Sequence, residues 1–150
     1  MQSIKFSDIA TFCYGKMPDK IHIIKNGFPI FSGYQISGYY DTYNCENDEL
    51  VLIARGVGGT GEIRKTPDKC WLTNLAIKIS LKDENLALKD YLFYKFQAND
   101  LRILRSGSAQ PQITINDLMD YEFNVPNIVE QRHIVDIIQT LFLVCLLLYL

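Results

Sequence analysis

The fold is decided by one stretch near the C-terminus, which reads SGSAQPQIT at residues 106–114, YEFNVP at 121–126 and VEQRHIV at 129–135. Small residues with Gln110-Pro111 predict a constrained turn, because proline fixes its own φ and pushes the preceding residue out of the helical region. Thr114 with Asp117 three residues later predicts a helix N-cap with an acidic first turn, so a short helix should run through Leu118 and Met119.

A strand and a longer helix should follow that short helix. Phe123 and Val125 alternate with polar neighbours, the period of a half-buried strand, and Pro126 closes it. Asn127 can then cap a helix with Glu130 at its third position. An apolar stripe with helical spacing continues along this helix at Ile134, Ile137, Ile138 and Leu141.

Upstream, short apolar runs separated by turn residues predict strands. Ile21 to Tyr43 is divided by glycines and proline into short strands, with tyrosines at positions that suit either base stacking or ordinary packing: Tyr34, Tyr39, Tyr40 and Tyr43. Leu50–Ile53 is a compact strand, the glycine-rich segment 55–61 follows, and Glu62–Lys65 is another strand. A phosphate loop is rejected because the required Lys-Ser/Thr pair is absent and a strand comes next, so we predict a hairpin whose glycines adopt positive φ.

The remaining elements complete an α+β fold. Leu75 to Leu81 alternates strictly and predicts a strand, preceded by Trp71 as a core anchor, and Leu88 to Phe96 carries a helical stripe. Ile4 to Gly15 is expected to form a short helix capped at Ser7-Asp8. The fold class is therefore α+β, with a mixed, mainly antiparallel sheet and short helices, ending in the start of a C-terminal helix.

Composition narrows the function classes. A chain of 150 residues has room for one domain and one core, and its net charge of -2 is not the positive excess typical of a nucleic-acid binder. If DNA is the ligand, the cations must gather on one face or a partner must supply much of the phosphate attraction. The four cysteines have no CxxC spacing, which argues against a zinc site and favours free, buried thiols in a reducing cytoplasm.

The ordered motifs resemble a known family. GSAQPQIT at 107–114, a strand ending in proline and EQRHIV at 130–135 resemble the end of a target recognition domain in the DNA specificity subunits of type I restriction-modification systems. The run YLFYKF at 91–96 is similar to the helix that precedes GSAQP in that family. Arg55-Gly56 resembles a turn common inside the recognition domain, and Phe6, Ile9 and Gly15-Lys16 resemble the domain's opening.

The resemblance implies a specificity component without catalytic activity or cofactor, which reads double-stranded DNA for a separate adenine-N6 methyltransferase subunit and a restriction subunit. A single domain would read half of a bipartite site, so a homodimer or a second specificity half would be required. The residues expected to contact DNA are Arg55, Arg64, Lys65 and Lys69 around the hairpin, Arg102 and Arg105 ahead of the turn, and Gln110 within it. A solvated basic rim explains the hairpin cations equally well.

The C-terminus departs from the family, whose long helix continues beyond this point. Residues 1–126 are predicted to be the recognition domain and 127–150 a truncated spacer or dimerisation helix. The tail at 141–150 carries no charge, and ten residues make about 15 Å of helix, short of the roughly 20 residues that cross a bilayer. Extending the count back to Ile134 meets Asp136, Gln139 and Thr140, so no membrane span is expected and a cytoplasmic location follows.

Enzymatic alternatives lack their motifs. No Asp/Asn-Pro-Pro-aromatic string or glycine-rich cofactor loop for methyl transfer is present, and Pro67-Asp68-Lys69 lacks the second carboxylate of a metal-dependent nuclease. Two rivals to DNA reading remain. One is a truncated interaction module that binds methyltransferase or homologous specificity subunits without reading DNA, favoured by the net charge and the apolar tail. The other is the specificity domain of a single-chain restriction-methylation enzyme.

Overall fold

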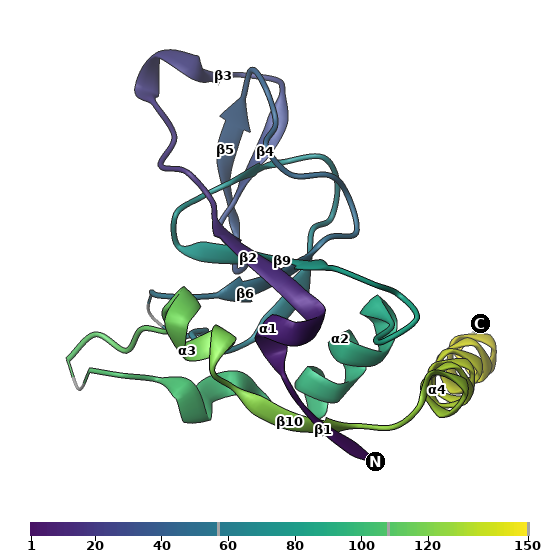
Figure 1. Ribbon diagram of the computed structural model, residues 1–150. Coiled ribbons are helices and arrows are strands. Elements are labelled where there is room, and N and C mark those ends of the chain that lie inside the picture. The colour runs from purple at the N-terminus through teal and green to yellow at the C-terminus, as the bar shows by residue number, and fades with distance from the viewer. Residues whose placement is uncertain (57, 108, 150) are drawn as a thin grey trace.

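A computed structural model describes residues 1–56, 58–107 and 109–149, so Val57 and Ser108, which fall in the two predicted turns, and Leu150 lie outside the described residues. The chain forms an α+β fold with three small sheets (Figure 1). The main sheet has the order β2-β9-β6-β7, from β2 Ala10–Tyr14, β9 Ala76–Leu81, β6 Leu50–Ile53 and β7 Ile63–Lys65, and all its pairs are antiparallel. The predicted fold class is confirmed.

The main core lies between this sheet and α2 Lys89–Ala98. All four residues of β6 are buried, and the helical stripe Tyr91, Leu92 and Phe96 packs on the sheet, as its spacing predicted. Phe6 is fully buried, with ring centroids of Phe12, Phe96 and Phe123 within 5.0 to 5.5 Å. Aromatic rings at these separations add to the stabilisation from area burial. The N-terminal segment and the C-terminal strand therefore share one core.

The predicted helix over Ile4 to Gly15 is mostly wrong. The chain forms β1 Gln2–Lys5, a single turn α1 Phe6–Ile9 and then β2. Phe6 and Ile9 do lie on one helical turn, but Phe12 belongs to β2, which is the edge partner of β9. A spacing of three apolar residues fits one turn of helix, and only pairing with distant β9 decides that the next residues are extended. β1 itself pairs with β10 Glu122–Val125 in a separate two-stranded sheet.

The third sheet forms a lobe above the main sheet, with the order β3-β5-β4-β8 (Figure 1). Its strands are β3 Ile23–Ile24, β5 Ile36–Tyr40, β4 Phe28–Phe31 and β8 Trp71–Leu72, preceded by the 3-10 helix η1 Lys20–His22. We call residues 16–43 the distal lobe. Trp71, expected to anchor the core, is only half-buried: its ring lies 4.1 Å from that of Tyr40, and its Nε1 donates to the Lys16 carbonyl.

The cysteines are free in the part of the chain that the structure describes, as expected. Cys45 and Cys70 are buried in a small core beside β6 and β8, and their backbones pair as an isolated antiparallel β-bridge. Cys13 and Cys145 are exposed, so the expectation of burial holds for only half of the thiols. Among residues 1–56, 58–107 and 109–149 no group of three or more His, Cys, Asp or Glu is placed to hold a metal ion.

Both predicted helix caps near the C-terminus are confirmed. The Thr114 side chain accepts from the Asp117 amide to begin α3 Ile115–Met119, and Asn127 accepts from the Glu130 amide to begin α4 Ile128–Leu148. A second 3-10 helix, η2 Leu101–Leu104, precedes the 106–112 loop. Side-chain oxygens satisfy amides that have no partner within the helix, which is why these local signals fix where each helix begins.

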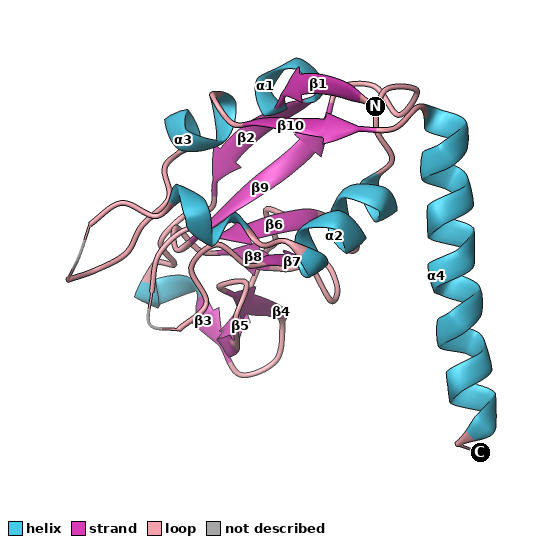
Figure 2. Ribbon diagram, turned by 90° about the horizontal axis from the view of Figure 1, so that it is seen from below, coloured by secondary structure: helices cyan, strands magenta, loops and turns pink. Residues whose placement is uncertain are grey.

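α4 extends along one side of the molecule (Figure 2) and packs on it through a face that includes only the half-buried Ile138 of the predicted stripe. Its buried residues are Gln131 and Val135, whereas Ile134, Ile137 and Leu141 of the predicted stripe are exposed by 37%, 47% and 58%. Gln131 decides this orientation: it is fully buried, donates to the carbonyls of Leu86 and Pro126, and accepts from the Leu88 amide.

The membrane count from the sequence, which went back only to Ile134, left out the first turns of this helix. α4 begins at Ile128, as the Asn127 cap predicted, and its 21 residues are long and apolar enough to cross a membrane, with a mean hydropathy of 1.5 and 11% of its most apolar 18 residues buried. Core helices of water-soluble proteins share that length and composition, so the property by itself assigns no environment.

Candidate nucleic-acid interface

A turn and a loop meet beside the end of β6. Arg55 follows β6 directly, and its backbone forms an isolated antiparallel bridge with Gln112, which in turn bridges Ser106. The Ile113 amide donates to the Ala54 carbonyl at 2.8 Å, and the Thr60 hydroxyl lies 3.2 Å from the Gly56 carbonyl and 3.4 Å from that of Pro111. These contacts fasten the glycine-rich turn to the Gln-Pro loop, although fifty residues separate them in the sequence.

The turn has the glycines that its shape requires. Gly56 and Gly61 have φ of 125° and 96°, values that side chains other than glycine rarely adopt. A Cβ on Gly61 would also lie 2.7 Å from the Arg102 amide nitrogen, because η2 passes directly beneath the turn. The predicted hairpin between β6 and β7, with positive-φ glycines, is therefore confirmed.

Two pockets flank Arg55 and form what we call the Arg55 groove. The first, of about 430 Å³, lies between the turn and the loop and is lined by Arg55, Gly56, Gly58, Leu75, Ala109, Gln110, Pro111 and Gln112. The second, of about 280 Å³, is lined by Ser32, Tyr34, Gln35, Ile53, Arg55, Gly56, Gly59 and Leu75. Both pockets are lined by Arg55, Gly56 and Leu75, so they lie next to each other on either side of these residues.

Arg55 is exposed and has no carboxylate partner within the described residues. Its guanidinium carbon lies 5.8 Å from the centroid of the Tyr14 ring, which supports the side chain by a cation–π contact. Neither the 55–61 turn nor the 106–112 loop contains an Asp or a Glu, so they offer no negative charge. The guanidinium therefore keeps its charge and its donors available to a ligand.

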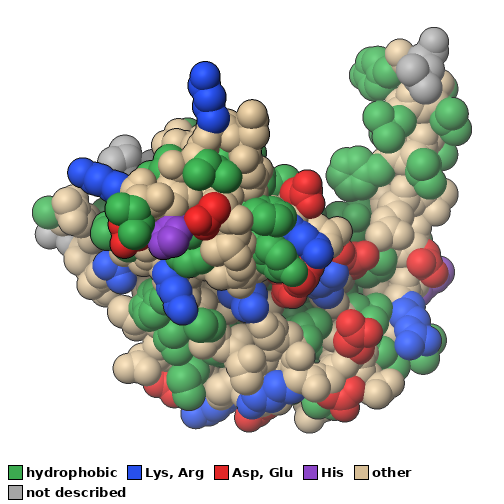
Figure 3. Space-filling view, turned by 90° about the horizontal axis from the view of Figure 1, so that it is seen from above, with side chains coloured by type: hydrophobic (Ala, Val, Ile, Leu, Met, Phe, Trp, Pro, Cys, Tyr) green, Lys and Arg blue, Asp and Glu red, His purple; other side chains and the backbone are tan. Residues whose placement is uncertain are grey.

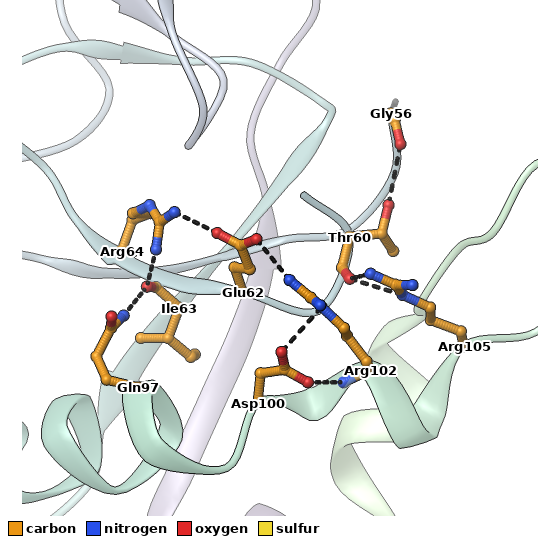
Figure 4. Close-up of polar contacts among 9 residues, drawn as sticks. All are labelled: Gly56, Thr60, Glu62, Ile63, Arg64, Gln97, Asp100, Arg102 and Arg105. Atoms are coloured by element: carbon orange, nitrogen blue, oxygen red, sulfur yellow. Dashed lines mark hydrogen bonds and ion pairs between the residues drawn. The ribbon is translucent and has the colours of Figure 1, made fainter. Parts of the chain in front are cut away.

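The arginines behind the turn differ in this respect (Figure 4). Glu62 pairs with both Arg64 and Arg102, the second through Oε1 at 2.8 Å, and Arg102 Nε also lies 2.8 Å from Asp100. Arg64 donates in addition to the Ile63 carbonyl. Each guanidinium is thus held by carboxylates from within the chain, which reduces the charge and the donors that it can offer to DNA.

Lys65 lies in a second network at the other end of β7. Its Nζ is 2.5 Å from Asp90 and 3.3 Å from Asp48, and Lys89 lies 2.5 Å from Asp48. Burial acts to lower the pKa of Lys65, but the hydrogen bond and charge of Asp90, with those of Asp48, outweigh it and raise the pKa above its ordinary value. The hydrogen bond from Lys89 lowers the pKa of Asp48. This network joins the hairpin to α2.

The other predicted contact residues have varied surroundings. Lys69 lies 4.9 Å from the Tyr43 ring centroid and 3.8 Å from Glu46. Arg105 donates from Nε and Nη2 to the Thr60 carbonyl and so fixes the base of the turn. Gln110 is exposed at the edge of the larger pocket. The structure therefore brings Arg55 and Gln110 into one groove, whereas Arg64, Lys65, Lys69 and Arg102 lie apart from it in ion pairs.

Sequence reasoning left out other residues of the groove. Tyr34 was one of several tyrosines with an open role; it is 66% exposed, whereas Tyr40 is buried. Gln35 was not considered, and Gln112 was named only as part of the Gln-Pro turn. Leu75 was assigned to a buried face, yet it is 38% exposed just before β9. The only sequence signal for an accessible surface near these residues was the glycine-rich turn at 55–61.

Solved structures define the class of fold. The chain superposes with a TM-score of 0.79 on the S subunit of a type I restriction-modification system from M. genitalium, at 21% identity over 93% of this chain and 38% of that one. It also matches an HsdS subunit from Thermoanaerobacter tengcongensis, with a TM-score of 0.69 and 17% identity over 93% of this chain and 36% of that one. The architecture is that of one part of a specificity subunit.

The sequence itself identifies the family. Residues 1–148 match the type I restriction modification DNA specificity domain, and the chain belongs to this family, as its motifs indicated. It is 28% identical over 112 residues to the specificity subunit of the type I restriction enzyme EcoprrI from Escherichia coli, covering 74% of this chain and 27% of that subunit. The chain thus spans well under half the length of the relatives it matches.

Proposed function

We propose that this chain is the sequence-reading part of a type I restriction-modification complex, which directs a separate adenine-N6 methyltransferase and a restriction subunit to a DNA target. Membership of the specificity-domain family supports this role. The observation that carries it is the Arg55 groove, where an unpaired guanidinium and the Gln110 amide share one pocket. These are side chains that read bases: arginine donates two hydrogen bonds to guanine, and glutamine pairs in the same way with adenine.

The chain's own part in the mechanism is to position the partner. The groove would lie against the base edges of a duplex, while the methyltransferase subunit holds the methyl donor and receives the flipped adenine. No step of the reaction uses a residue of this chain. The proposed division of labour assigns residues 1–126 to recognition and residues 127–150 to a spacer or dimerisation helix, in a cytoplasmic assembly.

The geometry also bears on stoichiometry. One groove with one arginine and three glutamines, Gln35, Gln110 and Gln112, can specify only a few base pairs, so a bipartite target needs a second recognition unit. That unit is either a second copy of this chain or a homologous specificity half. α4 is suited to joining them, because its C-terminal half, residues 141–148, exposes only apolar side chains.

The test is co-expression of this chain with its cognate methyltransferase subunit, followed by sequencing of the host DNA for N6-methyladenine. A new, defined methylation motif is expected, and a symmetric motif would identify two copies of this chain as the recognition units. A co-purifying complex that methylates nothing would contradict the proposal and favour the interaction-only alternative.

A further inference from the structure

The distal lobe carries the exposed cations that remain unpaired near the groove. Lys16, Lys20 and Lys25 are exposed, and within the described residues none of them has a carboxylate partner. None of the three was among the residues expected from the sequence to contact DNA. Figure 3, which looks down onto this lobe, shows lysine and arginine side chains spread over it between apolar ones.

The carboxylates of the lobe are already occupied. Asp19 caps η1 by accepting from the Ile21 amide at 3.2 Å, and Asp41 lies 2.7 Å from His22 Nδ1. Neither reaches a lysine. The two negative charges are therefore held in local hydrogen bonds, and the lobe presents three lysines that pair with no carboxylate of the described residues.

These lysines stand on a fixed platform. The Tyr40 ring lies 4.1 Å from Trp71 and 5.6 Å from His22, and its hydroxyl accepts from the Asp19 amide. The Asp41 amide donates to the His22 carbonyl. η1 is thus tied to β5 on both sides, so the backbone that carries Lys20 is held in place relative to the third sheet.

The lobe and the Arg55 groove share one side of the molecule. Figures 1 and 2 both place η1, the 55–61 turn and the 106–112 loop on the side away from α4. β5 connects the two sites, because Gln35 of the groove precedes it and Tyr40 at its end pairs with Ile23. Its five residues span about 17 Å, which corresponds to about five base steps of a duplex.

We propose that the distal lobe grips the phosphate backbone through Lys16, Lys20 and Lys25, about half a helical turn from the bases that the Arg55 groove reads. This inference rests on the proposed DNA-reading function. The lysines supply electrostatic attraction to phosphates although the net charge of the chain is -2. The exposed apolar side chains between them, Met17 and Ile21, can pack on the sugars of the same strand.

The experiment measures binding of the complex with its methyltransferase subunit to a fluorescent 40-base-pair duplex of mixed sequence, between 50 and 200 mM salt. The triple variant K16Q/K20Q/K25Q is expected to reduce the slope of log affinity against log salt by about 2.7, since each phosphate contact contributes about 0.9. The methylation motif should stay unchanged, because phosphate contacts carry no base information. K16R/K20R/K25R should restore the slope.

A charge-matched control is K5Q/K82Q/R132Q, which removes three exposed cations from β1, the end of β9 and α4. Its slope should equal that of the wild type. If the wild type binds DNA and both triple variants keep its slope, the lobe inference is overturned while the DNA-reading function stands. If the lobe variant loses its methyltransferase partner instead, the lobe is a protein interface. If the wild-type complex binds no duplex, the proposed function itself fails.

Discussion

The β6–β7 hairpin presents cations in two different states. Arg64, Lys65 and the nearby Arg102 are paired with Glu62, Asp90, Asp48 and Asp100, whereas Arg55 at the turn has no carboxylate partner among the described residues. These residues are close in sequence and similar in chemistry. The difference lies in what distant segments bring beside them, so counting basic residues does not locate a binding surface; their partners must be counted as well.

The two states also differ in what they contribute. Exposed ion pairs add little to stability, about 0 to 1 kcal/mol each, but they consume the donors that phosphates or bases would need. Polar groups satisfied inside the chain fix the shape of the domain, and those left open are available to a ligand. Substitutions in the two groups should therefore change different measurements.

Gln131 is fully buried and makes three hydrogen bonds, and the largest effect is expected there. Gln131→Leu would remove two donated hydrogen bonds and one accepted bond, and would take this partner away from the part-buried carbonyls of Leu86 and Pro126 and from the Leu88 amide. Each unsatisfied group costs about 1 to 3 kcal/mol, so the free energy of unfolding should fall by roughly 3 kcal/mol or more. Urea denaturation followed by circular dichroism measures it.

Gln139→Leu is the matched control on the same helix. Gln139 is exposed and makes a single 3.2 Å bond to Asp90, so the change should stay within about 0.5 kcal/mol. Equal losses for both variants would mean that Gln131 does not hold α4 to the domain.

The second prediction sets Arg55 against Arg64 in specific binding. Arg55→Gln should lower affinity for the methylated motif by about 1 to 3 kcal/mol, roughly 5- to 150-fold, because an unpaired guanidinium loses its base or phosphate contact. Arg64→Gln should change affinity less than twofold, since Glu62 already engages that side chain. Titration of the complex with motif-bearing and motif-free duplexes measures both. A larger loss for Arg64 would reverse the assignment of paired and unpaired residues.

Local sequence signals predicted the fold wherever neighbours in sequence decide the structure. The caps at Thr114 and Asn127, the alternation of β10 and the stripe of α2 each depend on a few adjacent residues. The signals failed where distant partners decide. Residues 10–14 are extended because they pair with β9, and α4 turns Gln131 rather than its isoleucine stripe inward because α2 and the end of β10 offer hydrogen-bond partners.

The same limit applies to the candidate site. The sequence pointed to Arg55 and Gln110, which the fold brings together, because each lies in a turn that small residues keep open. It could not show that Glu62 reaches Arg102 across forty residues, or that Asp90 on α2 reaches Lys65. The sequence did not predict that Tyr34 and Gln35 line a pocket, because no local residue pattern indicates which loops fold beside one another.

The smallest predicted effect concerns the ion pair between Asp48 and Lys89 at low pH. The hydrogen bond from Lys89 holds the pKa of Asp48 below its ordinary value of 3.8. A carboxyl group with a lowered folded pKa stabilises the protein above 3.8, and this stabilisation disappears as pH falls through the folded value. Asp48 is half exposed, so about 0.5 kcal/mol is expected at neutral pH. Asp48→Asn should remove it, and asparagine tolerates the φ of 56° at this position.

A double-substitution cycle isolates this pair. Asp48→Asn, Lys89→Met and the double variant, compared by urea denaturation at pH 7 and at pH 2.5, should give a coupling energy of about 0.5 kcal/mol at the higher pH and none at the lower. A coupling that persists at pH 2.5 would mean that packing rather than charge links the two residues. Since Arg55 has no such carboxylate partner, substituting it should leave the pH dependence of the free energy of unfolding unchanged. Urea denaturation therefore distinguishes the paired cations from the unpaired one without any DNA.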